Sequence, residues 1–167
     1  MKINNKEVKI ESFDVFTYRR IRRAIGYLGI SLPILLVGLS FISFFKTQLQ
    51  PSISHYYFTN LREIFTGTLC AVGLFLICYK GNRNPSILKN DHLLTNIAGI
   101  MAMGVAFVPV NPDDFAIKIY TLLPYPEKWL GWLHYGFPAL LFLIMALLSI
   151  NVFTIGPKNE KRDPKIP

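Results

Sequence analysis

Residues with the side chains needed for chemistry stand in two stretches that are far apart in the sequence. QPSISHYYFTNLREIFTG at 50–67 contains His55 and Glu63, and LHYGF at 133–137 contains His134. Two imidazoles and a carboxylate can hold a zinc ion and leave a fourth position for water, as catalytic zinc sites do. No HExxH or HxxxH spacing accompanies them. Metal-assisted hydrolysis or group transfer by His55, Glu63 and His134 is therefore one hypothesis, although the metal content is not predicted.

Ser52 and Ser54 suggest a second kind of chemistry. A serine attacks a carbonyl when a histidine accepts its proton and an acid orients that histidine. His134, with Glu63 or Asp113, would supply these types. Neither serine lies in a GxSxG motif, so a serine hydrolase is the weaker of the two enzymatic hypotheses.

The same region could bind a ligand without acting on it. The candidate ligand-binding residues are Tyr56, Tyr57, Arg62, Asp113 and Asp114. A structural interpretation is also open, because histidines and tyrosines at a membrane interface commonly anchor helix ends. Glu63 would then only complement the positive end of a helix, and the two aspartates would begin a turn after Asn111 and Pro112.

Four apolar stretches must position these residues. The chain of 167 residues is 51% hydrophobic and only 17% charged, which excludes most soluble domains. A bilayer core about 30 Å thick requires roughly 20 apolar residues in a helix. The stretches near that length are Ala24 to Phe45, Ile64 to Tyr79, Leu93 to Val110 and Leu133 to Phe153. The sequence predicts an all-α integral membrane four-helix bundle at 24–155, between basic tails at 1–23 and 156–167.

The distribution of lysine and arginine predicts the orientation. The N-terminal tail has seven, the connection between the second and third stretches has three and the C-terminal tail has four, which gives fourteen; the other two connections have two each, which gives four. Cytoplasmic segments carry the excess of basic residues. We therefore expect both termini in the cytoplasm, and His55 and His134 on the outer face of a bacterial inner membrane.

The basic motif YRRIRR at 18–23 and the net charge of +8 could also indicate nucleic-acid binding. A basic cluster directly before a span is, however, what membrane orientation and anionic lipids select. We expect membrane lipid as the partner and no nucleic acid.

Small residues predict where the helices approach each other. Ala98, Ala102 and Ala106 recur every four residues and line one helix face. Gly67 with Ala71, and Gly26 with Gly29, suggest further notches. The connection at 111–132 contains three prolines and is expected along the interface, with Trp129 and Trp132 in the aromatic belt.

The runs PSISHYYFTNLREIFTGTLCAVGLFLICYKG, NIAGIMAMGVAFVP and LHYGF, over residues 51 to about 150, resemble a bacterial family of multi-pass membrane proteins catalogued as a domain of unknown function. The chain is also distantly similar to DRAM-like proteins. The resemblance implies a serine- and tyrosine-rich outer connection with an acidic residue at the next span. The matching residues are Ser52, Ser54, His55, Tyr56, Tyr57 and Glu63. Many members have six spans, so a four-span form implies oligomers or a lost activity.

These observations predict a small inner-membrane protein whose outward polar cap binds a lipid head group or a partner protein. The alternative is the metal-assisted lipid hydrolase or transferase described above. A pore or effector would require a homo-oligomer, because no apolar stretch carries a stripe of charged residues.

Overall fold

The regular structure in the described part of the chain is helical. The computed structural model describes residues 5–79, 81, 84–110 and 128–154. These residues form four long helices and three short 3₁₀ segments, and they contain no strand. The elements are α1 (Asn5–Ser40), η1 (Ser43–Phe45), η2 (Ile53–Phe58), α2 (Arg62–Cys78), η3 (Ile87–Lys89), α3 (Asp91–Phe107) and α4 (Lys128–Thr154). The predicted all-α class is confirmed for this part of the chain.

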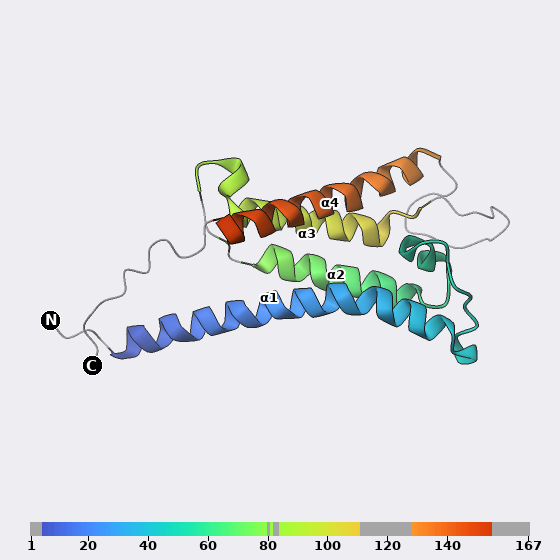
Figure 1. Cartoon of the computed structure of the whole chain (residues 1–167), viewed down its shortest axis with the longest axis horizontal. Coiled ribbons are helices and arrows are strands. Elements are labelled where there is room, and N and C mark those ends of the chain that lie inside the picture. Colours follow the sequence, from blue (N-terminus) through green and yellow to red (C-terminus); the bar gives the residue numbers. More distant parts are fainter. Residues whose placement is uncertain (1–4, 80, 82–83, 111–127, 155–167) are drawn as a thin grey trace.

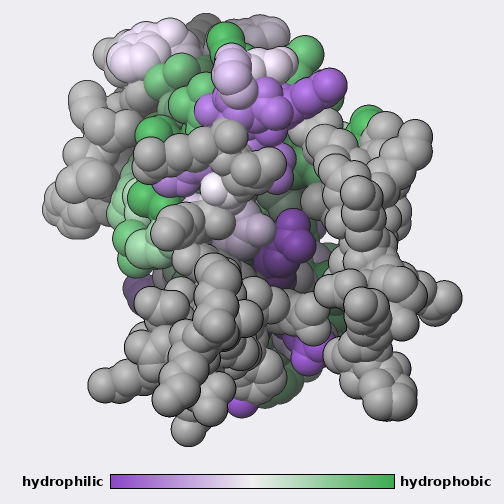
Figure 2. All heavy atoms as spheres, turned by 90° about the vertical axis from the view of Figure 1, so that its left-hand side faces the viewer, coloured by the Kyte–Doolittle hydropathy of each residue, from purple (hydrophilic) through white to green (hydrophobic). Residues whose placement is uncertain are grey.

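The four long helices lie side by side and run in alternating directions (Figure 1). η1, η2 and the start of α4 gather at one end, which we call the η2 end. The start of α1, η3 and the end of α4 lie at the other end, which we call the Arg22 end. Figure 2 shows the molecule from this end, where hydrophilic residues are grouped. α2 packs between α1 and α3, and α4 packs on α3. The residues of the two polar stretches therefore meet at the η2 end.

Two helices are long and apolar enough to cross a bilayer. The segments are Arg20–Ser40 in α1, with a mean hydropathy of 1.6, and Gly131–Ile150 in α4, with a mean hydropathy of 2.0. Only 11% of each segment is buried within the protein, whereas the core helix of a soluble protein would be mostly covered. α2 and α3 have 17 residues each, which is roughly 25 Å at 1.5 Å per residue.

Several helix ends differ from the predicted ones. α1 begins at Asn5 rather than Ala24, because residues 5–23 contain neither glycine nor proline to stop a helix. It ends at Ser40 rather than Phe45, and the chain then turns through Lys46, whose φ is 47°. Trp129 and Trp132 belong to α4 rather than to the preceding connection. Most of that connection, 111–127, lies outside the described residues.

α2 and α3 approach each other closely at Gly73 and Gly99. A Cβ added to Gly99 would lie 2.6 Å from the Gly73 carbonyl oxygen, and one added to Gly73 would lie 2.9 Å from the Gly99 carbonyl oxygen. Both residues are buried. Because neither has a side chain, the two backbones can touch, as in other small-residue helix contacts.

The predicted small-residue faces are partly right. Ala98, Ala102 and Ala106 are fully buried, which confirms the alanine face of α3. The predicted glycine notches are wrong, because a Cβ on Gly26, Gly29 or Gly67 would meet nothing within 4 Å. On α2 the glycine in contact is Gly73, six residues after Gly67. At about 100° per residue, six residues place the two on different helix faces.

Gly99→Ala should lower the free energy of unfolding by about 1–3 kcal/mol, since its new methyl group would overpack the backbone of α2. The matched control is Gly67→Ala, which adds the same methyl group in open space. It should leave stability unchanged or raise it by up to about 1 kcal/mol through helix propensity. Unfolding in mixed micelles measures both. Equal effects of the two substitutions would contradict the close contact.

Candidate functional site

The stretch 50–67 folds back into the η2 end instead of lying along its surface. Tyr56 and Tyr57, on η2, are only 1% and 2% exposed. They belong to a core cluster that also contains Leu32, Leu36, Leu61, Phe65 and Val105. The two tyrosines and the core residues around them close this end of the helices, and we call this group the η2 plug. The structural interpretation expected both rings at an exposed interface, whereas they lie in the core.

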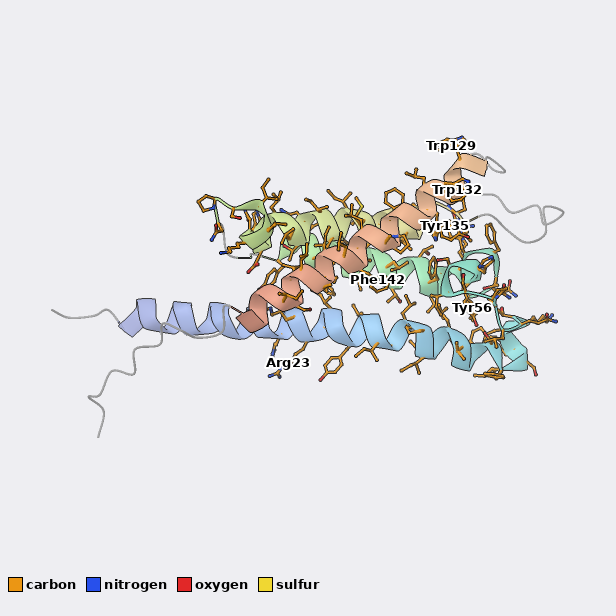
Figure 3. The ribbon with its side chains drawn as sticks, turned by 45° about the horizontal axis from the view of Figure 1, so that its top comes forward. Arg23, Tyr56, Trp129, Trp132, Tyr135 and Phe142 are labelled. Carbon is orange, nitrogen blue, oxygen red and sulfur yellow. The ribbon has the colours of Figure 1, made fainter. Side chains whose placement is uncertain are left out.

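A hydrogen bond joins this plug to α1. The hydroxyl of Tyr56 lies 2.7 Å from Ser40 Oγ and donates to it. Ser40 Oγ also lies 2.7 Å from the Leu36 carbonyl oxygen, to which it donates. A buried hydroxyl needs such a partner. Figure 3 labels Tyr56 near the last turns of α1. The end of α1 and η2 are thus held together at a polar point inside an apolar cluster.

Arg62 is held in place by Tyr57. Its guanidinium carbon lies 4.4 Å from the centre of the Tyr57 ring, and its Nη2 donates to the Tyr57 hydroxyl at 3.0 Å. Stacking on an aromatic face and a directed hydrogen bond both restrict the guanidinium. Arginine is the residue best suited to phosphate, because its fork of donors matches two phosphate oxygens.

Beside this pair lies an open hollow of about 330 Å³. We call it the Arg62 hollow. It is lined by Tyr57, Phe58, Thr59, Asn60, Arg62 and Glu63. The Asn60 side-chain amide donates to the Phe45 carbonyl at 3.0 Å and so fixes one wall to the segment after α1. Glu63 is exposed, so the hollow presents a cation and an anion from adjacent residues.

His55 pairs with Ser52 by a local contact. Ser52 Oγ and His55 Nδ1 are 2.6 Å apart, across the start of η2. Ser52 is exposed and His55 is half-buried. A serine hydroxyl bonded to an imidazole is the first half of a nucleophile and base pair. The same geometry also closes a turn, so the contact alone assigns no reaction. Ser54 instead lines a cavity between α1 and α4.

His134 is almost completely buried at the start of α4, with 1% of its surface exposed. Its Nδ1 donates to the Val108 carbonyl at 2.6 Å. In the neutral ring Nε2 then carries a lone pair, and within the described residues this nitrogen has no hydrogen-bond partner. His55 belongs to η2 and His134 to the first turns of α4, so both imidazoles are at the η2 end.

The predicted metal ligands do not come together as a set of three in the described ranges. These ranges contain no group of three or more histidine, cysteine, aspartate or glutamate residues that could hold a metal ion. Glu63 lines the Arg62 hollow. Asp113 and Asp114 lie outside the described residues.

Three partners in this site were not predicted from the sequence. They are Ser40 for Tyr56, Phe45 for Asn60 and Val108 for His134. Two of the three are backbone carbonyls, which every residue has, so the residue type does not show which carbonyl accepts the hydrogen bond. Exposed Trp129, Trp132 and Tyr135 follow one another along α4 at the same end (Figure 3).

Comparison of the chain with known protein families, with curated proteins and with solved structures found no match. The resemblance to a multi-pass family thus stays a prediction, and the site is interpreted from its own geometry.

Proposed function

We propose that this protein crosses a membrane four times and binds the head group of a phospholipid in the Arg62 hollow. The observation that carries the proposal is the guanidinium of Arg62, stacked 4.4 Å from the Tyr57 ring and bonded to its hydroxyl at 3.0 Å. Ordering this long side chain in advance reduces the entropy lost on binding. The hollow opens at the end of the helices, where head groups of a surrounding bilayer would lie.

The charges of the hollow favour a zwitterionic head group with a primary amine. Arg62 can bind the phosphate in a bidentate manner. Glu63, the next residue, can accept hydrogen bonds from an ammonium group. Phosphatidylethanolamine has both groups, whereas the quaternary amine of phosphatidylcholine has no N–H to donate. Phosphatidylglycerol has no amine and would leave Glu63 near a net negative head group.

The alternating directions of the helices support four crossings. If α1 and α4 span the bilayer, α2 and α3 traverse the same layer, because the chain is at the η2 end between α1 and α2 and at the Arg22 end between α2 and α3 (Figure 1). Their shorter length is matched by local thinning. Arg20, Arg22, Arg23 and Lys89 lie at the Arg22 end, which supports placing this end in the cytoplasm.

Cysteine labelling tests this topology. In a variant lacking Cys70 and Cys78, Gln48→Cys places a thiol at the η2 end and Ser86→Cys places one at the Arg22 end; both native residues are exposed. A membrane-impermeant maleimide added to intact cells should label only Gln48→Cys, and permeabilised cells should show labelling of both. Labelling of both variants, or only of Ser86→Cys, in intact cells would contradict the topology or its orientation.

Native mass spectrometry of the purified protein tests the head-group site. Phosphatidylethanolamine should bind more tightly than phosphatidylcholine of the same acyl chains. Arg62→Gln should weaken this binding about tenfold, the effect of losing hydrogen bonds to a charged group. Arg62→Lys keeps the charge but loses the planar set of N–H donors, so it should bind more tightly than Arg62→Gln and more weakly than the wild type. Glu63→Gln should reduce the preference for phosphatidylethanolamine over phosphatidylcholine.

The control for Arg62→Gln is Lys46→Asn. It removes a positive charge from the same end, outside the lining of the hollow, and asparagine tolerates the left-handed backbone of Lys46. It should leave lipid binding unchanged. Equal losses from both substitutions would show a general charge effect and contradict a site at Arg62.

The metal-assisted lipid hydrolase or transferase remains a second candidate. The observation that favours it is the buried Nε2 of His134, which lacks a hydrogen-bond partner in the described ranges and is at the same end of the helices as His55. Buried polar atoms without a partner are uncommon and call for a ligand, a water or a reaction.

Elemental analysis of the purified protein separates the two candidates. The enzyme candidate requires one metal ion per chain, lost in both His55→Ala and His134→Ala. The head-group candidate alone predicts no stoichiometric metal and unchanged phosphatidylethanolamine binding in these variants. His92→Ala, a histidine at the Arg22 end, is the control that should change neither measurement.

A further inference from the structure

A long apolar cavity of about 590 Å³ lies between α1 and α4, with α2 as its floor. We call it the α1/α4 groove. The floor includes Leu69, Val72 and Leu76, and the α4 wall includes Leu141, Phe142 and Met145; Phe142 is labelled about midway along α4 in Figure 3. The groove reaches from Arg22 to Ser54 and so runs along most of the apolar length of α1. Its size is that of ligand cavities, which are about 300–1,000 Å³.

The wall formed by α1 contains Gly26 and Gly29, the residues that the sequence suggested as helix-packing notches. Both line the groove. A Cβ at either position would meet no atom within 4 Å. The face of α1 that contains these two glycines therefore borders an open space instead of a neighbouring helix. The missing side chains widen the groove.

Arg22 marks the polar end of the groove. It also lines a smaller adjoining cavity of about 260 Å³, which shares Ile25, Leu76 and Met145 with the groove. The guanidinium carbon of Arg22 lies 5.5 Å from the centre of the Tyr79 ring. The remaining polar residues of the smaller cavity are Asp91, Thr95 and Ser149. An arginine at the mouth of an apolar cavity within a membrane segment indicates an anionic ligand.

We propose that the α1/α4 groove binds one acyl chain of an anionic phospholipid from the leaflet at the Arg22 end. Arg22 contacts the phosphate, and the chain extends along Gly26 and Gly29 toward Ser54. The Asp91 carboxylate can accept hydrogen bonds from a hydroxylated head group such as that of phosphatidylglycerol, which is the anionic lipid used in the test below.

Charge favours this lipid over a second copy of the chain as the occupant. The exposed helical segments that a second copy could insert, Arg20–Ser40 and Gly131–Ile150, contain no aspartate or glutamate. Neither could neutralise Arg22. A phospholipid supplies both an anion for the guanidinium and an apolar chain for the groove.

This proposal is separate from the head-group site in the Arg62 hollow. The two head groups would lie at opposite ends of the helices, one at Arg62 and the other at Arg22. Binding of phosphatidylglycerol in the groove should be unchanged by Arg62→Gln, and binding of phosphatidylethanolamine in the hollow should be unchanged by Arg22→Gln. Failure of one proposal therefore leaves the other standing.

The test is native mass spectrometry of the full chain with dioleoyl phosphatidylglycerol or dioleoyl phosphatidylcholine. The wild type should retain one phosphatidylglycerol per chain in preference to phosphatidylcholine. Arg22→Gln should weaken phosphatidylglycerol binding about fivefold. The matched control is Arg23→Gln, because Arg23 is exposed, does not line the groove and points away from the other helices in Figure 3. It should change binding less than twofold.

A second pair of variants tests the groove itself. Gly29→Leu should fill it and remove bound lipid of either head group. Gly67→Leu adds the same side chain at another exposed glycine, outside the groove, and should retain the lipid. Equal effects within either pair would overturn the proposal. So would a lipid-free wild type, or a protein dimer that Gly29→Leu dissociates and that excludes lipid.

Discussion

The backbone contact between Gly73 and Gly99 determines how the rest of the structure is arranged. It makes α2 and α3 a closely packed central pair. α4 then packs on α3, where a Cβ added to Gly104 would lie 2.6 Å from the Phe137 ring, while α1 packs on α2. Because α1 and α4 attach to different members of the pair, a groove is left between them. The same contact thus explains a tight centre and an open apolar side.

The η2 plug is the second element that depends on this pair. Tyr56, Tyr57 and Phe65 pack with Val105 of α3 and with Leu36 of α1. The plug therefore joins three helices at one end, where α1 would otherwise be held only along α2. Arg62 begins α2 directly after it, so stacking on Tyr57 links the start of a helix to the plug. Polar groups are concentrated at this end because the backbone leaves regular helix there.

The sequence predicted the helical class, the alanine face of α3 and the gathering of His55 and His134 at one end, since these depend on composition, periodicity and chain direction. It did not predict which glycine of α2 meets α3, because Gly67 and Gly73 look alike in sequence and differ only in the face they occupy. Nor could it show that Tyr56 and Tyr57 turn inward, since a tyrosine suits both an interface and a core that offers a hydroxyl partner such as Ser40. The hydrogen bond of His134 to the Val108 carbonyl, 26 residues away, could not be predicted either, because a backbone carbonyl is present at every residue.

The unbroken length of α1 has a mechanical consequence. Before the apolar segment begins at Arg20, the helix already extends from Asn5 to Arg19, roughly 22 Å at 1.5 Å per residue. This part of α1 is continuous with the segment that contains Gly26 and Gly29, so a tilt of its first turns also moves that segment. A tilt of the first turns of α1 would therefore change the width of the α1/α4 groove.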